Sequence, residues 1–495
     1  MADKDLEARH LETLDRDLGR FSDLELATSR VARRMAGPGI AFLFIVAAGL
    51  VAALFLGGTG DGLIVVIAAG FGAYMALNIG ANDVANNMGP AVGANALTMT
   101  GAIVIAAIFE SAGALIAGGD VVETISKGII APEGIASSDV FIWAMMAALL
   151  ASALWVNLAT WIGAPVSTTH AVVGGVVGAG GAAAGLGAVN WASLGTIAAS
   201  WVISPVLGAM IAAGFLWFIK ARIIYQDDKI AAARRWVPML VGIMAGAFAA
   251  YLALKGLNQL FHTPLGTAAL IGLCAGVATW AVMIPVIRRQ SEGLENRNRS
   301  LKALFNIPLV VSAALLSFAH GANDVANAVG PLAAIVETSR HDGTNGAVVA
   351  VPLWVMVIGA FGISVGLFLF GPRLIRMVGS EITKLNPMRA YCVALSAAIT
   401  VIVASWLGLP VSSTHIAVGA VFGVGFFREW DTERRLRKAR VDMPDRDWLS
   451  PEERGRRKLV RRAHVSTIAA AWVVTVPASA VMSAAIFLAI RAIAG

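Results

Sequence analysis

The chain has 495 residues, of which 58% are hydrophobic and only 14% are charged. Its mean hydropathy of +0.75 is far above that of soluble domains, in which roughly a quarter of the residues are charged. This composition excludes an ordinary soluble enzyme or binding domain and predicts an integral membrane protein. The formal net charge of +7 does not indicate a nucleic-acid partner, because the basic residues gather in a few loops between apolar runs.

A charged segment, residues 1–38, precedes the first apolar run. Leu11, Leu14, Leu18 and Phe21 fall on one helical face within it. This spacing predicts a cytosolic amphipathic helix at the membrane surface or against a partner, and a solvated extension without a partner is the alternative. The segment is not a signal peptide, because it lacks a short apolar core that ends in small residues.

Eleven apolar runs are long enough to cross a bilayer, which takes about 20 residues. They lie at 40–56, 63–80, 101–118, 141–162, 194–218, 236–254, 265–286, 306–320, 352–370, 389–407 and 466–490. Shorter apolar pieces at 171–187 and 416–427 need not cross completely. A lipid-facing backbone must satisfy its own hydrogen bonds, and no alternating pattern indicates a barrel, so we expect helices. The predicted fold is an all-α polytopic membrane protein with about 11–13 membrane helices and re-entrant hairpins.

Lys and Arg concentrate in particular loops, which the positive-inside rule places in the cytoplasm together with the N-terminus. These basic segments lie near 30–34, 220–235, 288–302, 373–384 and 428–463. The 119–140 and 337–350 connections are poor in positive charge and are expected outside. An odd number of crossings then separates the 63–80 run from the 306–320 run. Equivalent segments therefore run in opposite directions, which is the inverted-repeat arrangement of secondary transporters with a site near mid-membrane.

These features divide the chain into a series of predicted regions. They are the 1–38 cytosolic extension, the 39–218 first transmembrane repeat with its preceding helix, the 219–305 connecting helices and loops, the 306–427 second repeat, the 428–463 basic cytosolic insertion and the 464–495 final helix of the second repeat. We expect the insertion to lie along anionic headgroups rather than to bind nucleic acid.

One sequence motif, Gly-Ala-Asn-Asp-Val-Ala-Asn, occurs twice and closes an apolar run each time, with its aspartates at Asp83 and Asp324. An isolated carboxylate at mid-depth costs at least ~2.5 kcal/mol on insertion scales, so a function is expected. The Gly-Ala pair permits either close backbone approach or local unwinding, and unwinding would expose carbonyl groups as ligands. Neither motif contains Lys or Arg, so a small cation or a proton is the natural counter-charge. The predicted ligands are Asn82, Asp83, Asn86, Asn323, Asp324 and Asn327. Helix capping by Asn-Asp, or duplication for structural symmetry alone, are the plainer alternatives.

A second motif, Pro-Val-Ser-[Thr/Ser]-Thr-His, follows downstream of each copy and begins at Pro165 and Pro410. Each proline is expected in the first turn of a helix, together with three hydroxyl residues. The unpaired N–H groups and the positive dipole end of that turn bind oxyanions without a cationic side chain. The predicted anion ligands are Ser167, Thr168, Thr169, Ser412, Ser413 and Thr414. The alternative is that the hydroxyls only satisfy backbone carbonyls within the membrane.

Three further buried polar residues have less specific readings. His170 and His415 close the second motif and serve either in a proton relay or in packing around the site. Glu110, inside the 101–118 run, either binds an ion or pairs with a neighbouring helix. Cys274 and Cys392 lie in separate apolar runs, so neither a disulfide framework nor a thiolate metal site is expected.

Together the two motifs predict a coupling mechanism. An oxyanion beside Asp83 and Asp324 would be repelled at the low dielectric of the membrane interior, and bound cations or protons would reverse that repulsion. Anion binding would then require prior cation binding, which is symport.

The paired motifs resemble those of the inorganic phosphate transporter (PiT) family of sodium- or proton-coupled symporters, over residues 63 to 490. The resemblance implies phosphate uptake by alternating access across a bacterial inner membrane, inverted halves and a homodimer. It also implies that Asp83, Asn86, Asp324 and Asn327 bind the coupling cation, and that the six hydroxyl residues hold phosphate. It implies no cofactor and no metal beyond the coupling ion, and leaves Na⁺ and H⁺ both open.

Three other functions compete with this interpretation. A sulfate symporter of the same architecture is the near alternative. Two intramembrane aspartates could form an acid/base dyad for peptide hydrolysis, but the hydroxyl clusters are not required for such an enzyme. A sensor or scaffold is the third alternative and would bind ligand without transmembrane flux. The chain is not expected to be an enzyme.

Overall fold

The computed structural model describes residues 35–55, 62–130, 135, 137–162, 166–256, 263–340, 351–377, 385–442 and 462–494. For residues 377, 438–442, 462–472 and 494 it describes the backbone alone. Within these ranges the chain is helical apart from short connections, and one isolated β-bridge joins Ile130 to Val189. Eleven of the described helices are long and apolar enough to cross a membrane. The prediction of an all-helical polytopic membrane protein is therefore confirmed.

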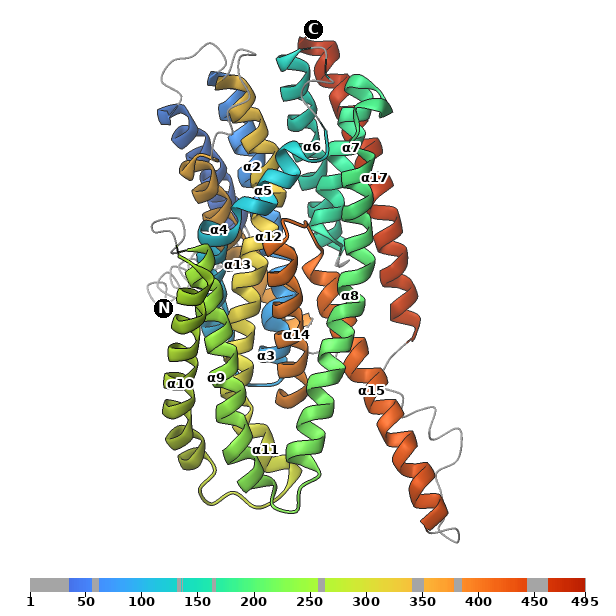
Figure 1. The fold of residues 1–495 in the computed structure, drawn as a ribbon. Coiled ribbons are helices and arrows are strands. Elements are labelled where there is room, and N and C mark those ends of the chain that lie inside the picture. Colours follow the sequence, from blue (N-terminus) through green and yellow to red (C-terminus); the bar gives the residue numbers. More distant parts are fainter. Residues whose placement is uncertain are drawn as a thin grey trace, which may run out of the picture.

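Most helices run along the long direction of the molecule, and the short α5 lies across it (Figure 1). The first half contains the helix Met35–Phe55, α2 (Gly62–Asn82), α3 (Val84–Gly93), α4 (Met99–Ala117), α5 (Gly119–Lys127), α6 (Ser138–Ile162), α7 (Thr168–Ala184), η2 (Leu186–Ala188), α8 (Trp191–Ile219) and η3 (Lys220–Ile224). The rest contains α9 (Lys229–Lys255), α10 (Leu265–Gln290), α11 (Asn298–Leu304), α12 (Asn306–Arg340), α13 (Leu353–Met377), α14 (Pro387–Trp406), α15 (Ser413–Asp442) and α17 (Arg462–Ala494).

Each of the eleven predicted apolar runs corresponds to one of the membrane-length helices. The run predicted at 306–320 is only the first part of α12, which has 35 residues. The start of the 428–463 insertion continues α15 as far as Asp442, and residues 443–461 lie outside the described part. The amphipathic helix predicted around Leu11 to Phe21 also lies outside it.

The two halves of the chain interlock through crosswise helix pairs. α2 packs against α13 and α4 packs against α12, while α7 packs against α17 and α8 against α15. Glycines allow the backbones to touch at these crossings, as small residues do in membrane proteins. A Cβ at Gly80 would lie 1.9 Å from the carbonyl oxygen of Ile363, and one at Gly321 would lie 2.1 Å from that of Glu110.

The matching positions on the partner helices are also glycines. A Cβ at Gly366 would lie 2.0 Å from the carbonyl oxygen of Leu77, and one at Gly113 would lie 2.0 Å from that of Phe318. Gly80 and Gly321 occupy the same position in the two motifs, so the crossings repeat from one half to the other. The opposite membrane orientation of the halves stays a prediction.

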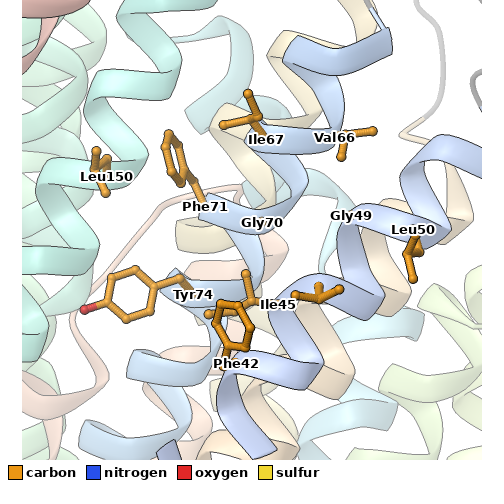
Figure 2. A pocket seen from close by; sticks show the side chains of 11 residues that line it. Phe42, Ile45, Gly49, Leu50, Val66, Ile67, Gly70, Phe71, Tyr74 and Leu150 are labelled. Atoms are coloured by element: carbon orange, nitrogen blue, oxygen red, sulfur yellow. The ribbon is translucent and has the colours of Figure 1, made fainter. Parts of the chain in front are cut away.

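An apolar cavity of about 610 Å³ lies between the Met35–Phe55 helix and α2, with Leu150 of α6 at one side (Figure 2). Phe42 and Ile45 line it from the first helix, and Phe71 and Tyr74 line it from α2. Its lining carries no charged side chain. It is therefore unsuited to hold an ion, and the polar residues of the two motifs lie elsewhere.

Candidate functional site

The two motif aspartates are placed by helices that continue almost without interruption. α2 ends at Asn82 and α3 begins at Val84, and Asp83 between them keeps helical backbone angles (φ −84°, ψ −29°). α12 runs through Asp324 as a regular helix. Of the two alternatives for the Gly-Ala pair, the structure shows close backbone approach, at the crossings of Gly80 and Gly321, and not local unwinding. Asp83 makes no side-chain capping bond either, which argues against helix capping.

Asp83 is buried and accepts hydrogen bonds from both hydroxyl motifs. Thr168 of α7 donates to its Oδ2 at 2.7 Å, and Thr414 of α15 donates to its Oδ1 at 3.2 Å. One carboxylate therefore joins the first-half motif to the second-half motif. Hydroxyl donors of this kind stabilise an ionised carboxylate.

Asp324 is equally buried but has a different set of partners. Ser413 donates to its Oδ2 at 3.1 Å, and Nε2 of His320 lies 2.8 Å from the same oxygen. Its second oxygen, Oδ1, has no hydrogen-bond partner among the described residues. A buried acceptor without a donor is costly unless another group, such as a cation, satisfies it.

His320 lies between two carboxyl groups, and the sequence reasoning did not single it out. Its Nδ1 lies 3.3 Å from Oε1 of Glu110, opposite the contact to Asp324, and all three side chains are buried. Asn87 also donates to Glu110 Oε1, at 3.0 Å. Glu110 was expected either to bind an ion or to pair with a neighbouring helix. The structure shows the pairing, because Glu110 lies in α4 and His320 lies in α12. The sequence did contain a signal for His320: the first copy of the motif has the apolar Ile79 at the same position, so a histidine there is a departure from the repeat.

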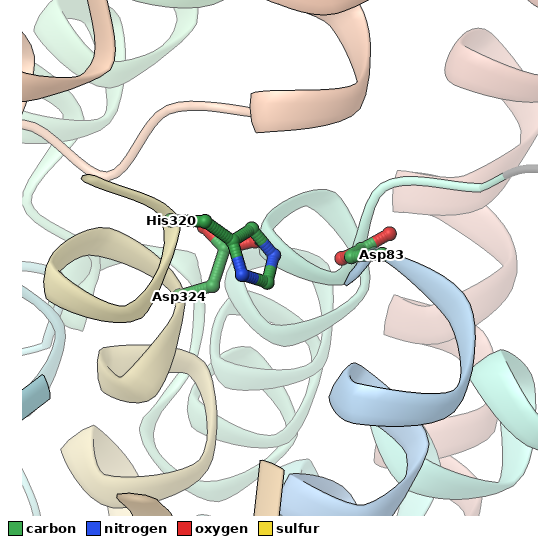
Figure 3. Close-up of side chains that lie close together, drawn as sticks. All are labelled: Asp83, His320 and Asp324. Atoms are coloured by element: carbon green, nitrogen blue, oxygen red, sulfur yellow. The ribbon is translucent and has the colours of Figure 1, made fainter. Parts of the chain in front are cut away.

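Asp83, His320 and Asp324 form one cluster at the centre of the molecule. Ligating atoms of all three lie within 4.8 Å of one another. In Figure 3, His320 and Asp324 project from α12 toward Asp83, which comes from the junction of α2 and α3. The two motif aspartates therefore share one buried site, although they are 241 positions apart in the sequence (83 to 324).

The hydroxyl residues occupy the starts of α7 and α15. Ser167 and Ser412 cap these helices by accepting the backbone N–H groups of His170 (3.2 Å) and His415 (3.3 Å). The remaining four hydroxyls lie in the first turns and are buried; they are Thr168, Thr169, Ser413 and Thr414. Pro410 lies in the loop before α15 and not in its first turn as predicted, and Pro165 lies outside the described residues.

The motif amides connect the two halves further. Asn86 donates to the hydroxyl of Thr414 at 2.9 Å, and Asn327 donates to Thr168 (3.2 Å) and Thr169 (3.1 Å). Each amide therefore reaches the hydroxyl motif of the opposite half. The carbonyl oxygen of Asn327 has no hydrogen-bond partner among the described residues.

Asn82 and Asn323 have a different role in the structure, because their amides hold neighbouring segments. Asn82 donates to Thr160 at 2.8 Å. Asn323 donates to the carbonyl of Leu409 at 3.1 Å and accepts the backbone N–H of Val411 at 3.2 Å. The oxygen of Asn323 is therefore used to fix the loop that precedes the second hydroxyl motif.

The two motif histidines meet behind the hydroxyl turns. The rings of His170 and His415 lie 4.5 Å apart in a T-shaped arrangement, and the ring of Trp201 on α8 lies 3.9 Å from His170. Trp201 also donates to the carbonyl of Pro410 at 3.0 Å. The starts of α7 and α15 are therefore held together, as the two converging anion-binding termini require.

The chemistry of this site follows from its charges and donors. Three buried carboxyl groups lie close together with one imidazole and no Lys or Arg from the described residues within ion-pair distance. Such a site attracts small cations through oxygen ligands. The hydroxyls and helix starts beside it offer donors to an anion.

Comparison with known proteins agrees with this chemistry. A family model described as the phosphate transporter family matches residues 79–483, which includes both copies of both motifs. The chain belongs to the phosphate transporter family. Its site, with paired aspartates and paired hydroxyl turns, is thus found in a chain whose family transports phosphate.

Individual members of the phosphate transporter family are similar over most of their length. A Helicobacter pylori (strain J99 / ATCC 700824) protein, provisionally named a phosphate permease, is 44% identical and the match covers 96% of this chain and 98% of that protein. Inorganic phosphate transporter 2-1, chloroplastic, of Arabidopsis thaliana is 37% identical over 83% of this chain and 70% of its own length. A solved structure titled the sodium-dependent phosphate transporter has 33% identity and a TM-score of 0.77, and the match covers 87% of this chain and 99% of that one.

Proposed function

We propose that this chain imports inorganic phosphate across the cytoplasmic membrane together with Na⁺, by alternating access. The observation that supports this most is the convergence of Asp83 and Asp324 with hydroxyl groups from the starts of α7 and α15. The similar structure titled the sodium-dependent phosphate transporter favours Na⁺ over H⁺ as the coupling ion.

The proposed coupling is electrostatic. Two unit charges about 5 Å apart interact with roughly 3 kcal/mol at an effective dielectric constant near 20. Phosphate that enters beside ionised Asp83 and Asp324 meets this repulsion more than once. Bound Na⁺ turns the repulsion into attraction, so phosphate binds only after the cation.

The proposed cation ligands are the carboxylates of Asp83 and Asp324 and the amide oxygens of Asn86 and Asn327. The free acceptors Asp324 Oδ1 and Asn327 Oδ1 support this assignment, because buried acceptors need a partner. Asn323 is proposed as a positioning residue, since its oxygen already holds Val411. Asn82 is proposed to position α2 against Thr160 of α6.

The proposed phosphate ligands are the hydroxyl and N–H groups at the starts of α7 and α15. Thr168, Thr169, Ser413 and Thr414 lie in the first helical turns, and Ser167 and Ser412 cap them. His170, His415 and Glu110 are proposed to support the site from outside. The two histidine rings pack against each other behind the hydroxyl turns, and Glu110 contacts His320 and Asn87.

Uptake of radiolabelled phosphate into proteoliposomes tests the proposal. Wild-type protein should accumulate phosphate under an inward Na⁺ gradient at fixed pH, and a pH gradient without Na⁺ should not replace it. Asp83→Asn and Asp324→Asn should each lower accumulation at least about 100-fold, since a charged ligand contributes roughly 3 kcal/mol or more. Asp139→Asn is the matched control, because Asp139 is exposed at the start of α6.

Two further measurements separate the competing interpretations. Unchanged coupled uptake by both site variants would overturn the proposal, provided that both proteins insert at wild-type levels. Strong inhibition of phosphate uptake by low concentrations of sulfate would indicate the sulfate symporter instead.

The family resemblance also leads us to propose a homodimer with a cytoplasmic N-terminus. Light scattering of the purified protein and labelling of an introduced N-terminal cysteine in intact cells test these two points. Membership of a transporter family supports a function without catalysis, and purified protein should release no product from membrane peptide substrates.

A further inference from the structure

Two arginines converge on one tryptophan at the end of the molecule where α8 ends and α9 begins. The guanidinium carbon of Arg222 in η3 lies 5.7 Å from the ring centroid of Trp236 in α9, and that of Arg235 lies 5.6 Å from it. Phe218 of α8 fixes the same ring by a T-shaped contact at 5.1 Å. Two positive charges are therefore held beside each other on an indole that cannot turn freely.

Neither arginine has an acidic partner. Among the described residues, no carboxylate lies within ion-pair distance of Arg222 or Arg235. Lys220, at the start of the same turn as Arg222, by contrast pairs with Asp431 at 2.7 Å. The carboxylate of Asp228, in the adjoining turn, caps α9 by accepting the N–H of Ala231 at 2.9 Å. The two arginines, which have no carboxylate partner among the described residues, are therefore available to bind an anion from outside the chain.

Arg222 lies in an irregular turn of the backbone at the end of α8. Residues Lys220–Ile224 form a π-helical turn, a rare element that is frequently found at functional sites. Arg222 and Arg235 are both exposed. They come from two helices, so their convergence is a property of the fold.

An apolar track continues from the tryptophan along α9. Met239 and Ile243 lie three and seven positions after Trp236 and so share its helical face. Their side chains are 43% and 59% exposed in the single chain. A cationic site at the edge of an apolar helix face combines the features that bind a headgroup and the acyl chain below it.

We propose that Arg222, Trp236 and Arg235 form a binding site for the phosphate of an anionic phospholipid, whose acyl chain lies along Met239 and Ile243. The end that carries this site is rich in Lys and Arg and is predicted to be cytoplasmic, where anionic lipids attract basic residues. The planar guanidinium groups match phosphate oxygens, and Trp236 anchors the interface. The site is separate from the buried aspartates and does not depend on the transport proposal.

Native mass spectrometry of the full-length protein in detergent tests this site. Phosphatidylglycerol is titrated against the wild type and against the Arg222→Gln/Arg235→Gln double variant. The double variant should bind phosphatidylglycerol roughly 30-fold more weakly. Each basic residue near anionic lipid contributes about 1 kcal/mol, which is about five-fold in affinity, and two are removed. Arg434→Gln/Arg437→Gln is the matched control, since it removes the same charge from α15, where Arg434 lies alone over Trp430.

A milder variant guards against misfolding of the double variant. Trp236→Phe keeps a ring but weakens the cation–π contact, and it should lower phosphatidylglycerol affinity a few-fold. Phosphatidylcholine should bind wild type and variants alike. Equal retention of phosphatidylglycerol by the wild type, the double variant and Trp236→Phe would overturn the proposal. Displacement of the lipid by millimolar inorganic phosphate, with loss of phosphate binding in the double variant, would assign the site to free phosphate and also overturn it.

Discussion

Replacement of Gly321 by alanine should separate the helices that carry the site. A Cβ there would lie 2.1 Å from the carbonyl oxygen of Glu110 and 2.7 Å from its carbonyl carbon and Cα, whereas contacts under 3.0 Å essentially never occur. All three obstacles are backbone atoms, so no side chain can rotate away. α12 and α4 must then move apart by roughly 1 Å to reach ordinary contact.

The expected cost follows from that displacement. Overpacking of this kind destabilises by about 1–3 kcal/mol, and a backbone obstacle places Gly321→Ala near 3 kcal/mol, or roughly 150-fold in the folded-to-unfolded ratio. Transport should suffer more than stability, because Asp324 and His320 move with α12. Ion ligation tolerates about 0.2 Å, which is far less than the shift.

Thermal unfolding in detergent and proteoliposome uptake measure the two effects. Gly214→Ala is the control, because Gly214 lies within α8 and a Cβ there meets nothing within 4 Å. The control should melt at or slightly above the wild-type temperature, since alanine favours helix by up to about 1 kcal/mol. If Gly321→Ala melted with the control and transported normally, the close crossing of α4 and α12 would be refuted.

Three other substitutions test separate contacts. Thr168→Ala removes the 2.7 Å bond to Asp83 and should raise the half-saturating phosphate concentration roughly 10-fold or more, while Thr168→Ser should stay near wild type; equal values for both would contradict the assigned role. Burial raises the pKa of Asp431, but hydrogen bonds from Lys220 and Tyr225 and nearby positive charge outweigh this, so the pKa lies below its usual value. A lowered carboxyl pKa stabilises the fold above the unfolded value near 3.9 and loses that effect as pH falls through the folded value. Asp431→Asn should therefore lower the melting temperature at pH 7, and this difference should shrink as pH falls below about 4; a difference independent of pH would count against the ion pair. Thr124→Val removes a 2.7 Å bond to the carbonyl of Gly408 and should cost about 1 kcal/mol of stability, as melting would show; no loss would mean that this contact is dispensable.

The sequence predicted the helical architecture well, because bilayer thickness fixes the length of an apolar run. All eleven runs became membrane-length helices. Boundaries were less predictable where a helix passes the edge of its apolar stretch. α12 continues through Asp324 because its polar residues are buried against other helices, and α15 continues to Asp442 beyond its apolar part.

The site was predicted in its members but not in its geometry. Duplication pointed to Asp83 and Asp324, yet only the fold shows that hydroxyls from both halves meet at Asp83. The Gly-Ala pair left close backbone approach and local unwinding both open, because sequence alone does not tell a flexible glycine from one that admits a neighbouring helix. His320 was not predicted, because a comparison of the two copies identifies the residues they share, and only the second copy has this histidine.

The crosswise helix pairs bear on how the protein is made. α2 and α4 leave the ribosome long before α13 and α12, so their glycine faces wait in the bilayer without the surfaces they fit. Neither half can complete these crossings alone, and a chain that stops after α8 has the hydroxyl of Thr168 for Asp83 but lacks that of Thr414. The site is therefore assembled only once the late segments have been synthesised and inserted.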